Sequence, residues 1–349
     1  PGRNKPRMKR ARSDRSFTER QADTKESHSP MAATLPHVAA SVGGINMPYA
    51  ESLGLGCIAA VQGIRNIAHP VGSHGFLTPR SAGKDSTTGH WELAGLLLHR
   101  PFPLFPDGFP LELVKRFESA VGVSVIGNCA ASGTKIIERL GPEHIQTGKL
   151  ILYTSADSVF QLAAHETICP LSRLHEICAL ARNLLQGEFG VARVIARPFI
   201  GEPGSFTRTA GRRDFSLPPS GVTVLDLAAA REVGVLSIGK IHDLFAGRGI
   251  TRIVKAGSNE AAMRGADRVV REGAPFSLLF VNLIDFDTVW GHRRDPVGYA
   301  RSLERFDAWI GRFAASLPRG TLLAVTSDHG CDPMMPGSDH TREHVPIIA

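Results

Sequence analysis

Carboxylates and imidazoles gather directly after two short apolar runs, residues 277–284 and 322–326. The candidate metal ligands are Asp287, His292, Asp328, His329 and His340. In open α/β sheets, ligands bind outside the carboxyl ends of strands, so we expect these side chains to converge on one crevice. Aspartate and histidine without thiolate suit Mn²⁺, Zn²⁺ or Mg²⁺, and such sets hold paired ions in phosphoryl-transfer enzymes. One such histidine alone is as often a hydrogen-bonded core or surface residue, but two groups favour a metal centre.

A second cluster places three hydroxyls, Ser86, Thr87 and Thr88, directly after Lys84 and Asp85. A metal ion or a neighbouring base can activate such a hydroxyl as a nucleophile. The same Asp-Ser-Thr-Thr run is also typical of a helix start with aspartate as the N-cap. The two interpretations are compatible, because backbone N–H groups at a helix start stabilise phosphate.

A third cluster is cationic and lies near predicted strand ends or in the stretch 201–219. Its members are Arg197, Arg208, Arg212, Arg213 and Lys240. The planar guanidinium grips phosphate at two points, which favours an anionic ligand. We expect at least two of the five to lie on a solvated surface instead. The glycine and proline content of 201–219 predicts a joint between two units.

Short apolar runs predict the strands that position these groups. They are residues 149–154, 190–196, 234–238, 277–284 and 320–326, separated by segments long enough for helices. Strand alternating with helix predicts parallel sheets in an α/β architecture. Residues 48–56 predict a helix that ends at glycine.

The composition supports a folded α/β chain. It has 349 residues, 42% of them hydrophobic and 21% charged, which allows one large domain or two smaller ones and excludes a mostly disordered protein. The formal charge is +7, but the first 30 residues hold nine basic and four acidic residues, a net +5. We therefore expect residues 1–31 to be a disordered basic leader, and we expect no nucleic-acid partner.

Five widely spaced cysteines without a Cys-x-x-Cys pair disfavour a disulfide framework and indicate a reducing compartment. No apolar run approaches the roughly 20 residues that cross a bilayer. The leader also lacks the apolar segment of a secretion signal. We expect a cytoplasmic protein without a membrane partner.

Six segments together resemble one known family, bacterial phosphopentomutase, a member of the alkaline phosphatase superfamily. They are GKDSTTGHWELAG (83–95), residues 131–166, RVIARPFIG (193–201), RRDFSLPP (212–219), NLIDFDTVWGHRRD (282–295) and DHGCDPMMPGSDHTREHVP (328–346). The match extends from about Leu35 to the last residue, in the family's order.

The resemblance implies an α/β fold with an alkaline phosphatase-like core. A mostly parallel sheet flanked by helices forms that core, over residues 32–97 and 219–349, and a smaller α/β cap over residues 98–218 interrupts it. It implies an isomerase that interconverts ribose 1-phosphate and ribose 5-phosphate, and their 2-deoxy forms, in nucleoside and pentose phosphate metabolism. The implied cofactors are two Mn²⁺ ions, with Mg²⁺, Co²⁺ and Zn²⁺ as alternatives, and a bisphosphate sugar is the implied activator.

The resemblance also assigns roles to individual residues. Ser86 stands where the family usually has a threonine that carries the phosphoryl group. The metal ligands are Asp287, His292, Asp328, His329 and His340. The sugar phosphate contacts are Ser155, Asp157 and Val159, with Arg197, Arg212 and Lys240 on the phosphate. Arg208 and Arg213 receive no role.

The chain departs from the family at its front. The family begins with a hydrophobic strand that ends in a metal-ligand aspartate, whereas this chain has the polar leader, with Asp14 and Asp23 as the only aspartates. We therefore expect the chain to lack the family's N-terminal strand and also its C-terminal end. Two alternatives stay open: another metal-dependent phosphatase or mutase of the superfamily, and an inactive fragment that lacks the first metal-ligand aspartate.

Overall fold

The computed structural model describes residues 32–155, 157–273, 276–337 and 339–349, so the predicted leader lies outside the described residues. The chain divides into two compact units. The first unit comprises Pro1–Thr78, Arg293–Gly337 and Thr341–Ala349, and the second comprises Pro79–His292 and Ser338–His340. None of the described helices is both long enough and apolar enough to cross a membrane.

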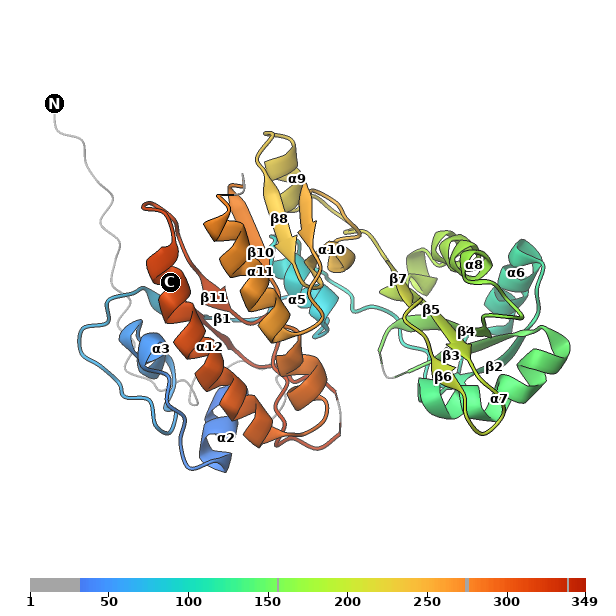
Figure 1. The fold of residues 1–349 in the computed structure, drawn as a ribbon, viewed down its shortest axis with the longest axis horizontal. Coiled ribbons are helices and arrows are strands. Elements are labelled where there is room, and N and C mark those ends of the chain that lie inside the picture. The colour runs from blue at the N-terminus through green and yellow to red at the C-terminus, as the bar shows by residue number, and fades with distance from the viewer. Residues whose placement is uncertain (1–31, 156, 274–275, 338) are drawn as a thin grey trace. The chain divides into compact units, whose positions relative to one another are not determined.

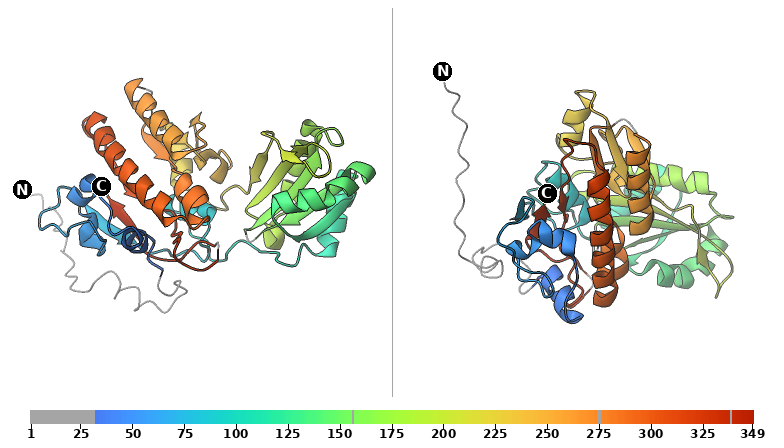
Figure 2. Two further views of the ribbon diagram at one scale, coloured as in Figure 1. Left: turned by 60° about the horizontal axis from the view of Figure 1, so that its bottom comes forward. Right: turned by 60° about the vertical axis from the view of Figure 1, so that its left-hand side comes forward.

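The first unit combines a small antiparallel sheet with a long helix. Its sheet has the order β1-β12-β11, with β1 at His74–Leu77, β12 at Val345–Ile348 and β11 at Val325–Thr326. Its helices are α2 (Thr34–Ser41), α3 (Pro48–Ser52), α4 (Leu55–Ile58) and α12 (Pro296–Ser316). Figure 2 shows α12 alongside α2 and α3, and apolar side chains from these helices form the core of this unit.

Two buried carboxylates in the first unit anchor the start of α2. Asp332 accepts a hydrogen bond from the Ala33 N–H at 3.1 Å, and Glu343 accepts from the Thr34 N–H at 2.8 Å and from its hydroxyl at 2.6 Å. Glu343 also accepts from the Thr341 hydroxyl at 2.7 Å. Burial raises the pKa of Glu343, and the hydrogen bonds from Thr34 and Thr341 offset part of that rise. Ala33 is the N-cap residue of α2 and has no side-chain acceptor. The two carboxylates therefore accept hydrogen bonds from the N–H groups at the start of this helix.

The second unit contains a parallel three-stranded sheet of order β10-β8-β9. The strands are Leu278–Val281 (β10), Val235–Ile238 (β8) and Arg252–Val254 (β9). Its helices are α5 (Ser86–Leu93), α9 (Val224–Ala229), α10 (Ile241–Leu244) and α11 (Asn259–Arg271), and a π-helix, η2, spans Phe286–Gly291. Trp91 is fully buried in the core of this region, and its Nε1 donates to the Leu244 carbonyl at 2.9 Å.

The second unit also contains a mixed sheet of order β2-β3-β4-β5-β6, in which β7 pairs with β5. The strands are Val125–Ala130, Leu150–Thr154, Val159–His165, Arg193–Ile200, Thr207–Arg208 and Arg213–Ser216. Helices α6 (Leu111–Val121) and α8 (Leu171–Leu184) pack on one face and α7 (Gly133–Thr147) on the other, and a 3₁₀ turn, η1, spans Gly187–Phe189 (Figure 1). All six strands fall within 98–218. The boundaries predicted for a cap stay a prediction.

The strand predictions were confirmed in part. The runs at 149–154 and 234–238 contain β3 and β8, and the run at 190–196 contains the first half of β5, which continues to Ile200. Only Val325–Thr326 of the run 320–326 pairs as a strand. Leu322 is 81% exposed, so the apolar letters of that run do not mark a buried strand here. The run 277–284 forms β10 only as far as Val281, and the chain then turns towards η2.

Three further predictions about local structure need correction. Residues 48–56 form two short helices, α3 and α4, because Gly54 adopts a left-handed conformation between them. The stretch 201–219 is not simply a joint, since it contributes β6 and β7 to the mixed sheet. The sheet of the first unit is antiparallel, whereas the alternation of strands and helices predicted parallel sheets.

Replacing Glu343 with alanine is expected to destabilise the protein by about 2–4 kcal/mol, because the hydroxyls of Thr34 and Thr341 and a helix N–H then lose their acceptor. Glu343→Gln keeps one acceptor oxygen and should cost less. Thermal unfolding measures both, with the exposed Glu188→Ala as the control. An unchanged unfolding temperature for Glu343→Ala would contradict the anchoring role.

Candidate active site

The π-helix η2 brings the side chains of Asp287 and His292 to the same side of the helix. The N–H of His292 donates to the carbonyl of Asp287 at 2.9 Å, five residues back, so one wide turn separates the two residues. His292 Nε2 lies 3.1 Å from Asp287 Oδ1 as a result. An α-helix aligns residues that are four positions apart, whereas Asp287 and His292 are five positions apart. The wider π turn is therefore what brings these two side chains together.

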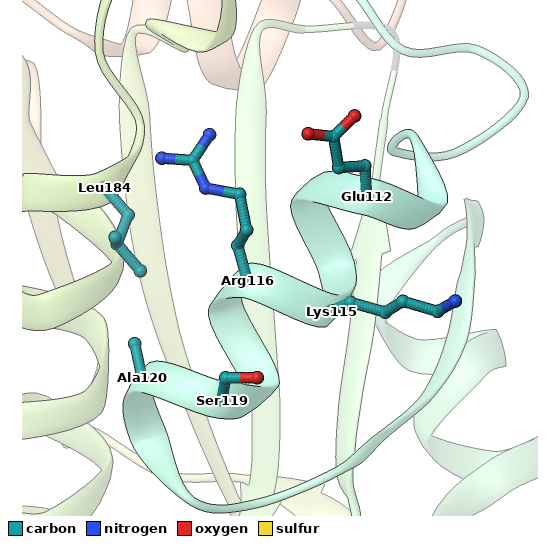
Figure 3. Close-up of a pocket in the computed structure, with 6 residues that line it drawn as sticks. All are labelled: Glu112, Lys115, Arg116, Ser119, Ala120 and Leu184. Carbon is teal, nitrogen blue, oxygen red and sulfur yellow. The ribbon is translucent and has the colours of Figure 1, made fainter.

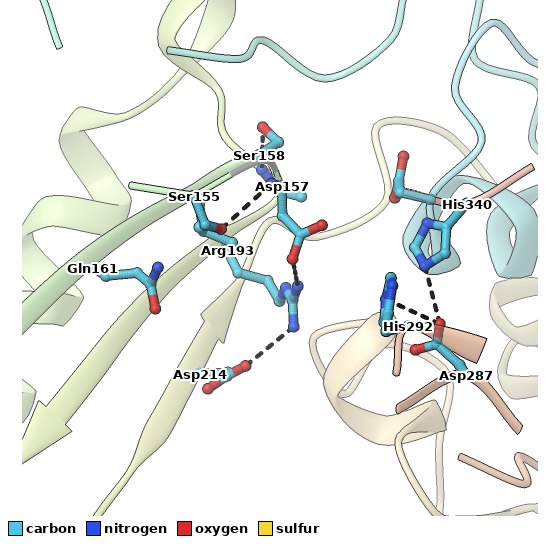
Figure 4. A network of polar contacts seen from close by, with 12 residues as sticks. Ser155, Asp157, Ser158, Gln161, Arg193, Asp214, Asp287, His292 and His340 are labelled. Atoms are coloured by element: carbon cyan, nitrogen blue, oxygen red, sulfur yellow. Dashed lines mark hydrogen bonds and ion pairs between the residues drawn. The ribbon is translucent and has the colours of Figure 1, made fainter. Parts of the chain in front are cut away.

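His340 joins this pair from a distant part of the sequence. Its Nε2 also lies 3.1 Å from Asp287 Oδ1, and the His292 and His340 rings lie 4.7 Å apart between centroids (Figure 4). One ligand atom from each of the three residues lies within 4.8 Å of the others. Two imidazoles and a carboxylate that converge in this way fit a first-row divalent metal ion.

Asp328 and His329 form a pair of their own in the first unit. They come one residue after the end of β11, and His329 Nε2 lies 3.3 Å from Asp328 Oδ2. The His329 side chain is buried, and Asp328 is partly exposed. Both residues therefore follow a strand, as predicted, while their union with Asp287, His292 and His340 in one centre stays a prediction.

Ser86 is the first residue of α5, and Asp85 is its N-cap. The Asp85 carboxylate accepts from the N–H of Thr88 at 3.0 Å and from its hydroxyl at 2.6 Å. Thr87 and Thr88 are buried, whereas Ser86 is partly exposed. Of the three hydroxyls, Ser86 is thus the one best placed to meet a substrate, next to the N–H groups of the helix start.

Lys84 links the start of α5 to the segment that carries His340. Its Nζ lies 2.7 Å from Asp339 Oδ2, and Asp339 Oδ1 accepts from the His340 N–H at 2.8 Å. Burial raises the pKa of Asp339, but the hydrogen bond and charge of Lys84 outweigh it, so the pKa is lowered. The carboxylate is ionised near neutral pH and braces the loop that presents His340.

The α7 face of the mixed sheet carries a row of three polar residues and one isoleucine that crosses four strands. Tyr153 is opposite Gln161, Gln161 is opposite Ile195, and Ile195 is opposite Asp214, so these side chains share one face. We call these four residues the cap row.

Three arginines flank the cap row. Arg197 Nε donates to Gln161 Oε1 at 3.1 Å, and Arg212 pairs with Asp214 at 2.8 Å. Arg193 lies 3.4 Å from Asp214 and 3.6 Å from Asp157 (Figure 4). Burial raises the pKa of Asp214, but the bond to Arg212 and the charges of the three arginines lower it by more.

Among the described residues, neither Arg197 nor Lys240 has a carboxylate at ion-pair distance. Burial is the main cause that lowers the pKa of each. The negative charge of Asp287 raises the pKa of Lys240, whereas the positive charges of Arg193 and Arg212 lower it further. A half-buried cation without a carboxylate partner is costly, so this arrangement favours an anionic ligand.

The remaining predicted substrate residues occupy the turn between β3 and β4. Ser155 Oγ accepts from the Asp157 N–H at 3.4 Å, and Asp157 is exposed. Val159 begins β4 and is only 2% exposed. Ser155 and Asp157 are therefore accessible to a ligand, whereas the Val159 side chain belongs to the interior.

Within the described part of the chain, Arg208 and Arg213 form no hydrogen bond or ion pair with the residues of the cap row. Arg213 stacks on Phe215 at 4.9 Å, and Arg208 is exposed on β6. A separate hollow on α6, drawn in Figure 3, is lined by Glu112, Lys115 and Arg116 with three neutral residues. It contains none of the predicted site residues.

The chain matches the sequence model of the metalloenzyme superfamily over residues 71–349. Phosphopentomutase of Caldanaerobacter subterraneus subsp. tengcongensis is 50% identical over 315 residues, which cover 90% of this chain and 80% of that protein. Phosphopentomutase of Acetivibrio thermocellus is also 50% identical, over 321 residues, with 90% and 81% covered.

The chain belongs to the phosphopentomutase family.

Membership in the phosphopentomutase family confirms the resemblance and the alkaline phosphatase-like α/β fold. The superfamily match also supports a metal-dependent enzyme, while the identity and number of the ions stay predictions. Among solved structures, the PH0037 protein from Pyrococcus horikoshii aligns with 90% of this chain and 84% of its own at 15% identity, with a TM-score of 0.45.

Sequence reasoning did not single out several polar residues beside the proposed site of this phosphopentomutase-family chain. They are Tyr153, Gln161, Arg193 and Asp214. Asp214 directly follows the Arg212–Arg213 pair, which was the one available signal that a carboxylate accompanies these cations. The others depend on strand register and on a contact between distant segments, which residue types alone do not reveal.

Replacing Asp287 with asparagine is expected to weaken divalent-metal binding by at least about 100-fold, since it removes the charge that both imidazoles face. Calorimetric titration of metal-stripped protein with Mn²⁺ measures this change. The control is Asp243→Asn, because Asp243 forms a comparable pair with His242 at 3.2 Å outside the cluster. Equal Mn²⁺ affinity for Asp287→Asn and the parent would contradict the metal site.

Asp214 should make the stability of the folded protein depend on pH in the acidic range. Because its folded-state pKa lies below the ordinary value, its contribution is present above about pH 4 and is lost as the pH falls through the folded pKa. Asp214→Asn should lower the unfolding temperature at neutral pH and flatten its decline between about pH 5 and about pH 3. An equally steep decline in the variant would show that other groups cause it.

Proposed function

We propose that this chain acts as a phosphopentomutase, interconverting ribose 1-phosphate and ribose 5-phosphate and their 2-deoxy forms. The observation that carries the proposal is the 50% identity to phosphopentomutases over 90% of the chain. The second unit offers chemistry that suits this reaction: a convergent Asp/His cluster, a hydroxyl at a helix start and cations that lack carboxylate partners.

Ser86 is proposed as the nucleophile that carries the phosphoryl group. Phosphorylated Ser86 gives its phosphoryl group to one hydroxyl of the sugar phosphate and takes the other phosphoryl group back, so one P–O bond forms as another breaks. The N–H groups of α5 stabilise negative charge on the transferred group. Thr87 and Thr88 are less suited, because both are buried and the Thr88 hydroxyl is committed to Asp85.

Asp287, His292, Asp328, His329 and His340 are proposed to hold two Mn²⁺ ions, with Mg²⁺, Co²⁺ or Zn²⁺ as alternatives. Bound ions of this kind neutralise charge on a transferring phosphoryl group and lower the pKa of an attacking hydroxyl. Asp339 and Lys84 keep the His340 segment and the start of α5 together.

The proposed substrate contacts come from the segment 98–218 and from Lys240, the N-cap residue of α10. Ser155 and Asp157 are proposed to line the sugar position, and Arg197, Arg212 and Lys240 to bind phosphate. Val159, the third predicted sugar contact, has a buried side chain and is proposed only to support this position from the start of β4. Arg197 and Lys240 suit this task because no described carboxylate neutralises them. We further propose that 98–218 is a cap domain that excludes water from the intermediate, and that a bisphosphate sugar primes Ser86.

All five cysteines are free thiols. Thiols persist in reducing compartments, which supports a cytoplasmic location in pentose phosphate metabolism.

Conversion of ribose 1-phosphate to ribose 5-phosphate with Mn²⁺ tests the function. Ser86→Ala should abolish both turnover and radiolabelled phosphoenzyme, because the acceptor oxygen is gone, whereas Ser86→Thr should retain them. Release of inorganic phosphate faster than isomerisation would indicate a phosphatase of the superfamily. Failure of metal-loaded parent protein to isomerise would overturn the proposal.

A further inference from the structure

Two reciprocal hydrogen bonds join the start of the π-helix η2 to the start of α11. Asp285, the N-cap residue of η2, accepts from the Asn259 N–H through Oδ2 at 2.7 Å, and the Asp285 N–H donates to Asn259 Oδ1 at 2.8 Å. The Asp285 side chain makes no capping bond to its own helix. Each residue therefore supplies an acceptor to a backbone N–H at the start of the other's helix, where no intrahelical acceptor exists.

Asn259 is not needed to cap α11 itself. That task belongs to the N-cap residue, Ser258, whose Oγ accepts from the Ala261 N–H at 3.2 Å. Asn259 is only 4% exposed, and its Nδ2 finds no hydrogen-bond partner among the described residues. An unpaired buried donor lowers stability, so the useful part of this side chain is the oxygen that it offers to Asp285.

Helix α11 is a firm support for this contact, because its inner face packs closely on the parallel sheet (Figure 1). Ala262, Ala266 and Val269 are each at most 1% exposed. At Gly265 the approach is so close that an added Cβ would lie 3.1 Å from Val254 Cγ1 on β9. A shift of α11 along the sheet would disturb these contacts, so the position of Asn259 is fixed by the core.

The segment 282–285 leads from β10 to η2 and is held at both of its ends. At the first end, the Asn282 N–H donates to the Ile238 carbonyl on β8 at 3.0 Å. At the second end, Asp285 is held by Asn259 and lies two positions before Asp287. Because η2 is a single wide turn with few hydrogen bonds of its own, the place where it begins must be set from outside.

We propose that Asn259 is a positioning residue for the metal centre: through Asp285 it fixes the start of η2, and thereby the approach of Asp287 to His292. The inference rests on the proposed function only for the metal ion that this pair would bind. Asn259 itself is outside the group of converging ligand atoms. Residues that orient metal ligands in this way typically contribute 10–100-fold to metal affinity.

Amide hydrogen exchange of the metal-free protein tests the positioning role. Asn259→Ala should speed exchange of the His292 N–H, which donates to the Asp287 carbonyl, because η2 loses the bond that fixes its start. The matched control is Ser258→Ala, which removes a side-chain bond at the same helix start and leaves Asp285 untouched. Parent-like exchange of the His292 N–H in Asn259→Ala would overturn the proposal, and so would equal acceleration in both variants.

Titration of the metal-stripped proteins with Mn²⁺ measures the consequence for the site. Asn259→Ala should weaken Mn²⁺ binding by about 10–100-fold, whereas Ser258→Ala should bind Mn²⁺ as the parent does, although both lose a bond at the start of α11. Parent-like Mn²⁺ affinity in Asn259→Ala would reduce the role of Asn259 to helix capping and overturn the proposal.

Asp285→Asn separates positioning from direct ligation. The variant keeps an oxygen that can accept from the Asn259 N–H, and it should therefore retain the parent's Mn²⁺ affinity. A loss as large as that of Asp287→Asn would make Asp285 a metal ligand and overturn the positioning role. If the parent binds no Mn²⁺ while Asn259→Ala still speeds exchange at His292, the proposed metal site fails and the positioning role stands.

Discussion

Asp214 makes it possible for arginines to share one face of a small sheet. Its carboxylate lies within ion-pair distance of Arg193 and Arg212, and the charge of Arg197 also reaches it. Asp214, together with Asp157 at 3.6 Å from Arg193, cannot neutralise three arginines, so the face keeps a positive excess in a half-buried setting. The electrostatic cost of that excess falls when an anion binds, which ties the stability of this region to its ligand.

The metal cluster depends on a different constraint, the wide turn of η2. An α-helical path from Asp287 would rotate His292 away from the carboxylate, whereas the i+5 hydrogen bond closes the pair. The turn follows Asp285, which is held in place by a reciprocal exchange with Asn259: Asp285 Oδ2 accepts from the Asn259 N–H at 2.7 Å, and Asn259 Oδ1 accepts from the Asp285 N–H at 2.8 Å. The irregular helix is thus supported from α11 and is a built feature of the site.

The sequence allowed prediction of the ligand types and of the strands that precede them. Asp287, His292 and His340 converge as expected, because strand ends and loop lengths leave few other places for them. The predicted extents of β10 and β11 were wrong. A run of apolar residues does not distinguish a paired strand from an exposed irregular segment such as the one around Leu322. The cap row could not be predicted, because Tyr153, Gln161 and Asp214 meet only through strand register.

The 2.7 Å pair between Lys84 and Asp339 joins two loops that are 255 positions apart in the chain, one ending at Ser86 and the other at His340. Neither Lys84 nor Asp339 is a proposed nucleophile or metal ligand, yet each lies close in the sequence to a residue that is, Ser86 or His340. In evolutionary terms we expect the two positions to change together, because a change of charge at either one leaves the other without its ion-pair partner. Related chains that exchange lysine at the first position should therefore also have lost the acid at the second.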